Sequence, residues 1–333
     1  MRTHLKWYSF RWQVGVAILL VLILPAATCW YSQKGKYIHP IGSGPAGFPV
    51  SAQLFEHPWS ARKVVLIGLG DSITAGYGAS EGHGYFDLLV KNDNSRYPEM
   101  KGRDLSHAFT KLLSHNHSIS GTISQEHLTD QVPGVQTYPS DVLGVVVITT
   151  GGNDIIHDYG KSPPRDGAAY GCTYDQGIQW KETFRKRLKG IIEGTIARFP
   201  GGCEIFLANI YDPTDGIGDI HNAHAMLPRW PDGLKVHAEF NKVIAEAYAK
   251  YPNVHLVDIH SVFLGHGIHC ENKRNKYYRA DDPHYWYYEN LEDPNDRGYD
   301  AIRRAFLIEM AEVFDKTDMP AQMHLQGEVP AEP

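Results

Sequence analysis

Short apolar runs alternate along the chain with longer stretches in which apolar residues recur every three or four positions. The runs are rich in Val, Ile and Leu, as is typical of strands buried on both faces of a parallel sheet. We place these strands at residues 64–69, 145–150, 204–210 and 254–257. The stretches with helical spacing are residues 105–114, 179–199, 232–251 and 298–315. Alternating strands and helices predict a three-layer α/β/α sandwich.

The first 30 residues do not follow this pattern. Arg2, Lys6 and Arg11 precede an apolar run at residues 14–24, and small residues follow it. This order is typical of a secretory signal peptide. The run is shorter than the roughly 20 apolar residues that span a bilayer, although a few more residues would complete an uncleaved anchor. We expect an exported protein, secreted or periplasmic, or one anchored by residues 1–30.

Composition then divides the rest of the chain. Residues 31–61 are rich in Gly and Pro, which predicts an extended linker without packed structure. Residues 62–318 form the predicted globular domain, and 42% hydrophobic residues in a chain of 333 suffice for one large core. The polar residues 319–333 form a predicted disordered tail.

Charge limits the possible binding partners, and the cysteines limit the possible disulfides and metal sites. The formal net charge of -6 arises from well-mixed acids and bases, without the basic stripe that follows a phosphate backbone. We therefore expect no nucleic-acid partner, and membrane contact only through the N-terminal segment. Beyond Cys29, whose small neighbours only partly fit a lipidation signal, Cys172, Cys203 and Cys270 allow one disulfide of unspecified pairing. No Cys-x-x-Cys spacing is present, so we expect no metal site.

A serine follows the first predicted strand directly, in Gly70-Asp71-Ser72-Ile73. Open α/β sheets bind ligands at the carboxyl ends of their strands. The glycine permits a sharp turn that exposes the hydroxyl, and the next helix offers N–H groups to negative charge. These properties suit a serine nucleophile. A plain helix cap is the alternative; a dinucleotide-binding turn would need a third glycine where Ile73 stands.

An asparagine occupies the same position after a second strand, in Gly151-Gly152-Asn153-Asp154. Its side-chain amide can point two N–H donors into the pocket of Ser72, where negative charge develops during acyl transfer. An ordinary Asn-Asp turn is the alternative.

Residues 70–74, 118–122 and 151–154 resemble three signature blocks of the SGNH (GDSL-like) hydrolase family of esterases, lipases and carbohydrate acyl hydrolases. The resemblance implies that Ser72 is the nucleophile and that an oxyanion hole is formed by Ser72, Gly121 and Asn153. The supporting motif residues are Gly70, Asp71, Gly151 and Asp154. It also implies a flavodoxin-like parallel sheet of about five strands in the order 2-1-3-4-5.

The family's last block is Asp-x-x-His, followed by Pro-Asn and then Gly-Tyr. Residues 281–284, Asp-Asp-Pro-His, carry the spacing, whereas residues 294–299 carry the continuation. Directly before this continuation, Asp293 stands where many family members keep the histidine, and Asn290 stands where they keep the aspartate.

Because neither Asp293 nor Asn290 carries an imidazole, we assign the general base to His284. Asp281, three residues earlier, is then its orienting partner, with Asp282 as the second choice. Residues 285–292 become an inserted loop.

The resemblance implies a serine esterase that forms an acyl-enzyme without a metal or cofactor. Short-chain or carbohydrate O-acyl esters are favoured because no strongly apolar loop lies near the motifs, and lysophospholipids remain compatible. Residues 285–288, Tyr-Trp-Tyr-Tyr, form either an aromatic platform for substrate or the packing of the loop. Residues 212–219 form a candidate lid.

Two other functions share these residues: an acyltransferase acting on an envelope polysaccharide, and a non-catalytic glycan-binding module. An α/β-hydrolase of the Gly-x-Ser-x-Gly type is set aside, because no Gly-x-Ser-x-Gly sequence follows directly on a predicted strand.

Overall fold

The computed structural model describes residues 39–223 and 227–318. The expectations for the signal segment, for Cys29 and for the tail concern residues outside this range. No described helix is long and apolar enough to cross a membrane.

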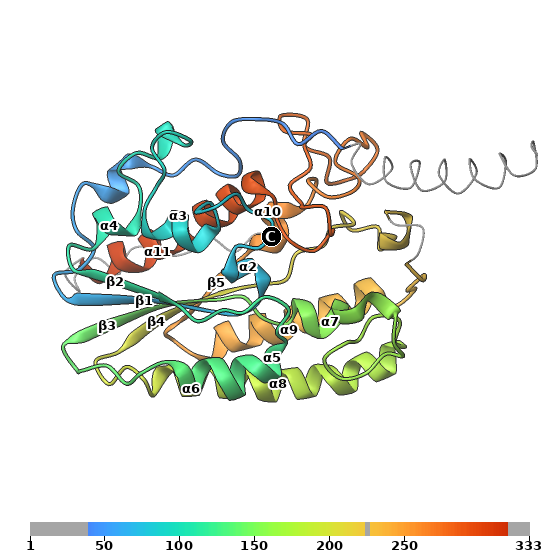
Figure 1. Ribbon diagram of the computed structural model, residues 1–333, viewed down its shortest axis with the longest axis horizontal. Helices are drawn as coiled ribbons and strands as arrows, with labels where there is room; N and C mark the ends of the chain where they lie inside the picture. The colour runs from blue at the N-terminus through green and yellow to red at the C-terminus, as the bar shows by residue number, and fades with distance from the viewer. Residues whose placement is uncertain (1–38, 224–226, 319–333) are drawn as a thin grey trace, which may run out of the picture.

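A single parallel sheet forms the middle layer of the molecule (Figure 1). Its strands are β1 (Lys63–Leu69), β2 (Leu112–Asn116), β3 (Val142–Ile148), β4 (Cys203–Ala208) and β5 (Val254–Val257). Their order is β2-β1-β3-β4-β5, which confirms the predicted sheet and its topology. Every residue of β3 and all but the first of β1 are buried, as expected of strands covered on both faces.

Helices cover both faces of the sheet, with a core on each side (Figure 1). One face carries α3 (Tyr85–Val90), α4 (Leu105–Ala108), α10 (Ile259–Phe263) and α11 (Asp296–Asp318). The other carries α5 (Ser124–Glu126), α6 (Val132–Gly134), α7 (Gly152–Ile156), α8 (Tyr174–Ile196) and α9 (Gly233–Lys250). Shorter segments are α2 (Ser72–Ala75), η1 (Ala52–Phe55), η2 (Pro98–Met100), η3 (His127–Gln131), η4 (His157–Gly160) and η5 (Ile220–Asn222).

The helix expected at residues 105–114 is wrong in its second half. Helix α4 ends at Ala108, and residues from Leu112 onward form β2, which pairs in parallel with β1. The spacing of apolar residues fits a helix, but the backbone hydrogen bonds to β1 decide the structure. Strand β2 lies at the sheet edge and is largely exposed. Its sequence therefore shows little of the alternation of apolar and polar residues by which a strand is recognised.

The segment before β1 is irregular, as expected, but residues 39–61 are packed against the domain. Ala46, Val50 and Trp59 are buried. Trp59 stacks on Phe314, and the Ala46 N–H donates to the buried carboxylate of Asp300 at 3.0 Å. An unpacked linker is therefore the wrong description of this part, because its few apolar side chains complete the core against α11.

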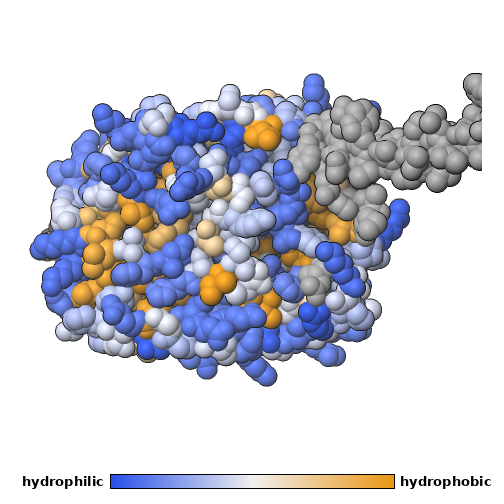
Figure 2. All heavy atoms as spheres, in the orientation of Figure 1, coloured by the Kyte–Doolittle hydropathy of each residue, from blue (hydrophilic) through white to orange (hydrophobic). Residues whose placement is uncertain are grey.

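Cys172, Cys203 and Cys270 are buried and free, so the permitted disulfide is absent among the described residues. Burial raises the pKa of Cys172 to about 11 and that of Cys203 to about 12, which keeps both as unreactive thiols. Figure 2 shows that the outer surface seen from this side is mostly hydrophilic, with apolar side chains gathered toward β1 and β2. Leu113 of β2 is 62% exposed there.

Candidate active site

Ser72 is the first residue of α2 and lies just beyond the carboxyl end of β1. The turn before it requires a glycine, because Gly70 has φ +135° and a Cβ there would lie 2.3 Å from the Thr149 carbonyl oxygen. The close approach joins the ends of β1 and β3. It leaves Ser72 half-buried at the wall of a cavity.

Asp71 fixes this turn. Its carboxylate accepts hydrogen bonds from the Ile73 N–H at 3.1 Å and from the Thr149 hydroxyl at 2.9 Å. Burial raises its pKa to about 6, in spite of these bonds. Asp71 therefore acts as the helix cap, while Ser72 is left to face the cavity.

The segment containing Gly121 is fastened beside Ser72. The Gln131 side chain accepts from the Gly70 N–H and donates to the Gly70 carbonyl, both at 2.8 Å. The Asn153 side chain donates to the Thr122 carbonyl at 2.9 Å.

Ser72 and Asn153 both line the cavity, whereas Gly121, exposed at φ +83°, lies on the adjoining turn and not in the cavity wall. The structure thus brings two of the three oxyanion-hole candidates together. The oxyanion role of all three stays a prediction.

Asp154 and Gly151 support Asn153. The Asp154 carboxylate accepts from the Ser124 N–H at 2.8 Å and from its hydroxyl at 2.5 Å, and Arg187 lies 3.4 Å away. Gly151 has φ +96°, and a Cβ there would lie 2.8 Å from the Phe184 ring. The position of Asn153 is therefore set by buried contacts on both sides.

The contacts of His284 lie outside the cavity that Ser72 lines. Its Nδ1 bonds Asp282, whose other carboxylate oxygen accepts from Arg297 at 2.6 Å. Its ring lies against Gly42, where a Cβ would be 2.6 Å from Cγ. Asp281 is exposed, and His284 is not among the residues that line the cavity.

The structure therefore pairs His284 with Asp282, the second choice, and not with Asp281. The His284 ring lies against residue Gly42 of the segment that precedes β1.

Asp293 is the residue that the structure brings to Ser72. Desolvation by burial raises the pKa of Asp293, and the neighbouring Ser72 hydroxyl and Asn290 amide partly offset this effect. The Asn290 Nδ2 donates to Asp293 Oδ2 at 2.6 Å. Asp293 Oδ1, in contrast, has no partner at full hydrogen-bond geometry. The sequence pointed to Asp293 through its position before Pro294, but the lack of an imidazole led us to dismiss it.

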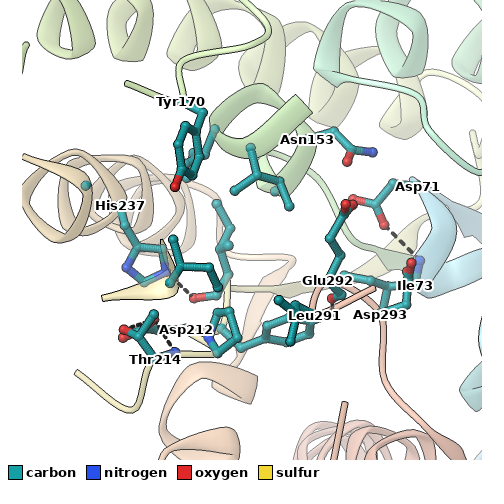
Figure 3. A pocket seen from close by; sticks show the side chains of 18 of the residues that line it. Asp71, Ile73, Asn153, Tyr170, Asp212, Thr214, His237, Leu291, Glu292 and Asp293 are labelled. Carbon is teal, nitrogen blue, oxygen red and sulfur yellow. Dashed lines mark hydrogen bonds between the residues drawn. The ribbon is translucent and has the colours of Figure 1, made fainter. Parts of the chain in front are cut away.

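The cavity extends from Ser72 across the ends of β3 and β4, with a volume of about 1030 Å³ that includes open solvent. In Figure 3, Asp71, Asn153 and Asp293 lie at one side, and Tyr170, His237 and Asp212 lie at the other. Its wall is mostly apolar between these groups. Contributing side chains include Ile155, Ile156, Tyr170, Ile210, Trp230 and Leu234.

Glu292 also lines the cavity, and Figure 3 shows its side chain between Asp71 and the apolar wall. Desolvation raises its pKa to about 8, and the nearby charges of Asp293 and Asp71 add to the effect. Glu292 is therefore mostly protonated at neutral pH.

The aromatic run at residues 285–288 packs the loop. Tyr285, Trp286 and Tyr287 are buried, and Trp286 stacks on His266 with ring centroids 3.4 Å apart. Only Tyr288 is half-buried, in an edge contact with Tyr77. The residues 212–219 expected as a lid contribute Asp212, Pro213, Thr214 and Gly218 to the far wall of the cavity.

A serine at a strand-to-helix turn and an asparagine at the next strand end, in an α/β/α sandwich, define a class of serine hydrolases. The sequence profile of the GDSL-like lipase/acylhydrolase family matches residues 69–301. The chain belongs to this family, which confirms the prediction of a serine hydrolase that acts on ester bonds.

Solved structures with a similar fold share little sequence with this chain. The lipase Lip_vut3 from a goat rumen metagenome is 18% identical over 75% of this chain and 97% of its own, with a TM-score of 0.43. Phospholipase A1 from Streptomyces albidoflavus NA297 is 18% identical over 76% and 99%, with a TM-score of 0.43. A variant of Axe2, an acetyl xylan esterase from Geobacillus stearothermophilus, is 17% identical over 75% and 95%, with a TM-score of 0.41. Comparison with curated protein sequences found no significant match.

Proposed function

We propose that the chain hydrolyses carboxylic esters whose hydrophobic acyl group enters the cavity beside Ser72. The observation that carries this proposal is the apolar wall that begins at the nucleophile and ends near His237. A cavity of this kind binds an alkyl chain by removing it from water, at about 0.8 kcal/mol per methylene.

In the proposed reaction the Ser72 Oγ attacks the ester carbonyl carbon, and the negative charge on the carbonyl oxygen is stabilised by the Ser72 N–H and the Asn153 amide. The carbon–oxygen bond to the alcohol then breaks, which leaves an acyl group on Ser72. Water attacks this acyl-enzyme and releases the carboxylic acid.

The cavity also changes the preferred substrate. The sequence favoured short-chain or carbohydrate esters because no strongly apolar loop lies near the motifs, and residues 285–288 offered an aromatic platform for substrate as one of two interpretations. Since Tyr285, Trp286 and Tyr287 are buried, that platform is lost. An acyl group of about four to eight carbons uses more of the apolar wall than an acetyl group does.

A second candidate is a binding module that keeps the cavity without fast turnover. The specific observation in its favour is Asp293, which stands beside Ser72 where the family resemblance implies a histidine. This candidate predicts that acyl esters bind but are not hydrolysed.

Hydrolysis of p-nitrophenyl acetate, butyrate and octanoate tests the proposal. We expect kcat/KM to rise from acetate to octanoate by at most about fourfold per methylene. Ser72→Ala abolishes hydrolysis of all three. Asn153→Ala lowers kcat by about 10²–10³ while KM changes little, because the amide acts in the transition state.

A matched pair of variants tests the cavity itself. Leu234→Trp fills the far end and lowers kcat/KM for octanoate while leaving acetate unchanged. Leu113→Trp, on the exposed edge strand, changes neither. Equal loss for acetate and octanoate in Leu234→Trp would contradict the assignment of the cavity to the acyl group, and inert wild type that still binds octanoate would favour the binding module.

A further inference from the structure

We propose that Asp293 accepts the proton of Ser72, so that an aspartate held by an asparagine replaces the histidine and aspartate of the usual triad. This inference rests on Ser72 being the proposed nucleophile. It assigns a catalytic role to a side chain that the family resemblance would dismiss.

The first support is the position of the Asp293 carboxylate and the contacts of its two oxygens. Its side chain is 2% exposed and lines the same cavity as Ser72, close enough for the Ser72 hydroxyl to lower the pKa of Asp293. Oδ2 accepts from Asn290 at 2.6 Å, while Oδ1 is buried without a hydrogen-bond partner. One oxygen is thus anchored, and the other is available to a proton from the serine.

The second support is the turn that presents Asp293. Leu291 has φ +66°, a backbone conformation that a leucine rarely adopts. The Asn290 side-chain oxygen accepts from the Asp293 N–H at 3.1 Å, and the Tyr288 N–H donates to the Asp293 carbonyl at 2.6 Å. Such backbone strain persists only where surrounding contacts hold it, and it is concentrated at functional sites.

The third support is the charge around Asp293. Asp71 and Glu292 face the same space, and the buried hydroxyls of Tyr211 and Tyr299 lie close enough for its charge to act on them. Among the described residues that line the cavity there is no lysine or arginine. No cation of the cavity wall thus opposes the effect of burial, which raises the pKa of Asp293 above its ordinary value and makes its carboxylate a stronger base than an exposed one.

Three histidines that could serve as the base, His237, His284 and His260, have their contacts away from Ser72. His237 lines the cavity at the side opposite Asp293 in Figure 3, and its Nε2 lies 2.8 Å from the Ile210 carbonyl oxygen. His284 is held by Asp282. His260, which follows β5, lies against His237 with ring centroids 5.1 Å apart and does not line the cavity.

The proton balance of the reaction is complete with Asp293 alone. The Ser72 proton moves to Asp293 Oδ1 as Oγ bonds to the acyl carbon. The protonated Asp293 then gives this proton to the departing alcohol oxygen. In the second half, water gives a proton to Asp293 as it attacks the acyl group, and Ser72 recovers that proton when the acid leaves.

The test measures the rate at which a fluorophosphonate labels Ser72, because this reaction needs an activated serine but no turnover. The probe's phosphorus bonds to Oγ, and fluoride leaves. We expect Asp293→Asn, which keeps the shape and removes the base, to lower labelling and ester kcat by about 10²–10⁴ at pH 7.5. Glu289→Gln, an exposed acid in the same turn, changes neither rate.

A second variant covers the case in which Asp293→Asn fails to fold. Asp293→His combined with Asn290→Asp places an imidazole and its carboxylate at the same two positions. We expect it to recover at least tenfold of the lost labelling rate, with an inflection of the rate near pH 6.5, the ordinary histidine pKa.

Unchanged labelling in Asp293→Asn, together with loss in His284→Ala, would overturn the inference and restore the histidine base. Labelling that depends on Asp293 in a protein that hydrolyses no ester would uphold the inference while the proposed function fails.

Discussion

Replacing Glu292 by glutamine removes a carboxyl group that the fold keeps from water beside two other carboxyl groups. The pKa of Glu292 is about 8 in the folded chain and 4.5 as its ordinary value. Between these values the unfolded chain has lost the proton and the folded chain keeps it. The free energy of unfolding therefore falls as pH rises, by about 1.4 kcal/mol per pH unit over this window.

If the whole pKa difference applies, the free energy of unfolding falls by about 3.5 kcal/mol between pH 5 and pH 8. Because Glu292 is partly exposed and solvent screens its charge, we expect a fall of about 2 kcal/mol. Glutamine cannot ionise and avoids this loss. We expect Glu292→Gln to be more stable than wild type at pH 8, with the advantage shrinking to less than about 1 kcal/mol at pH 5.

Urea unfolding at pH 5, 6.5 and 8, followed by tryptophan fluorescence, measures this difference. Glu289→Gln serves as the control, because its carboxyl is exposed in the same turn. A stability difference between Glu292→Gln and wild type that is the same at all three pH values would refute the buried, protonated state of Glu292.

Three further predictions concern the scaffold. Gly70→Ala places a Cβ 2.3 Å from the Thr149 carbonyl oxygen, so we expect the free energy of unfolding, measured with urea, to fall by about 3 kcal/mol. Gly82→Ala, where the space is open, is the control and lowers it by about 1 kcal/mol. The Nε of the buried Arg303 donates to Asp300 at 2.7 Å. Asp300→Ala removes this partner, and we expect the free energy of unfolding to fall by about 3–5 kcal/mol in the same assay. The three described cysteines react with Ellman's reagent only after unfolding, and a reducing agent leaves the Tm unchanged; fast reaction of the folded protein would contradict their burial.

The central strands and the long helices could be predicted from the sequence, because their apolar residues follow the periods of buried strands and amphipathic helices. Strand β2 could not. Its residues 112–116 are mostly exposed at the sheet edge, and only pairing with β1 makes them a strand. The packing of Trp59 against Phe314 likewise depends on a contact between residues far apart in the chain.

Ser72 and Asn153 could be placed because each follows a buried strand, and parallel strands end at the same edge of the sheet. The partner of Ser72 could not be chosen in this way. His284 has the expected spacing to Asp281, but its contacts with Asp282 and Gly42 depend on the path of a loop. Asp293 had the expected position and the unexpected side chain. Its place in the wall of the Ser72 cavity is the reason why we propose it as the base.

The most direct test of the account is mass spectrometry of the wild-type chain quenched in acid within the first turnovers of p-nitrophenyl octanoate. We predict one octanoyl group per chain, on the peptide that contains Ser72, with slower accumulation in Asp293→Asn. Hydrolysis with no acyl group on Ser72, or with the acyl group on another residue, would contradict the account.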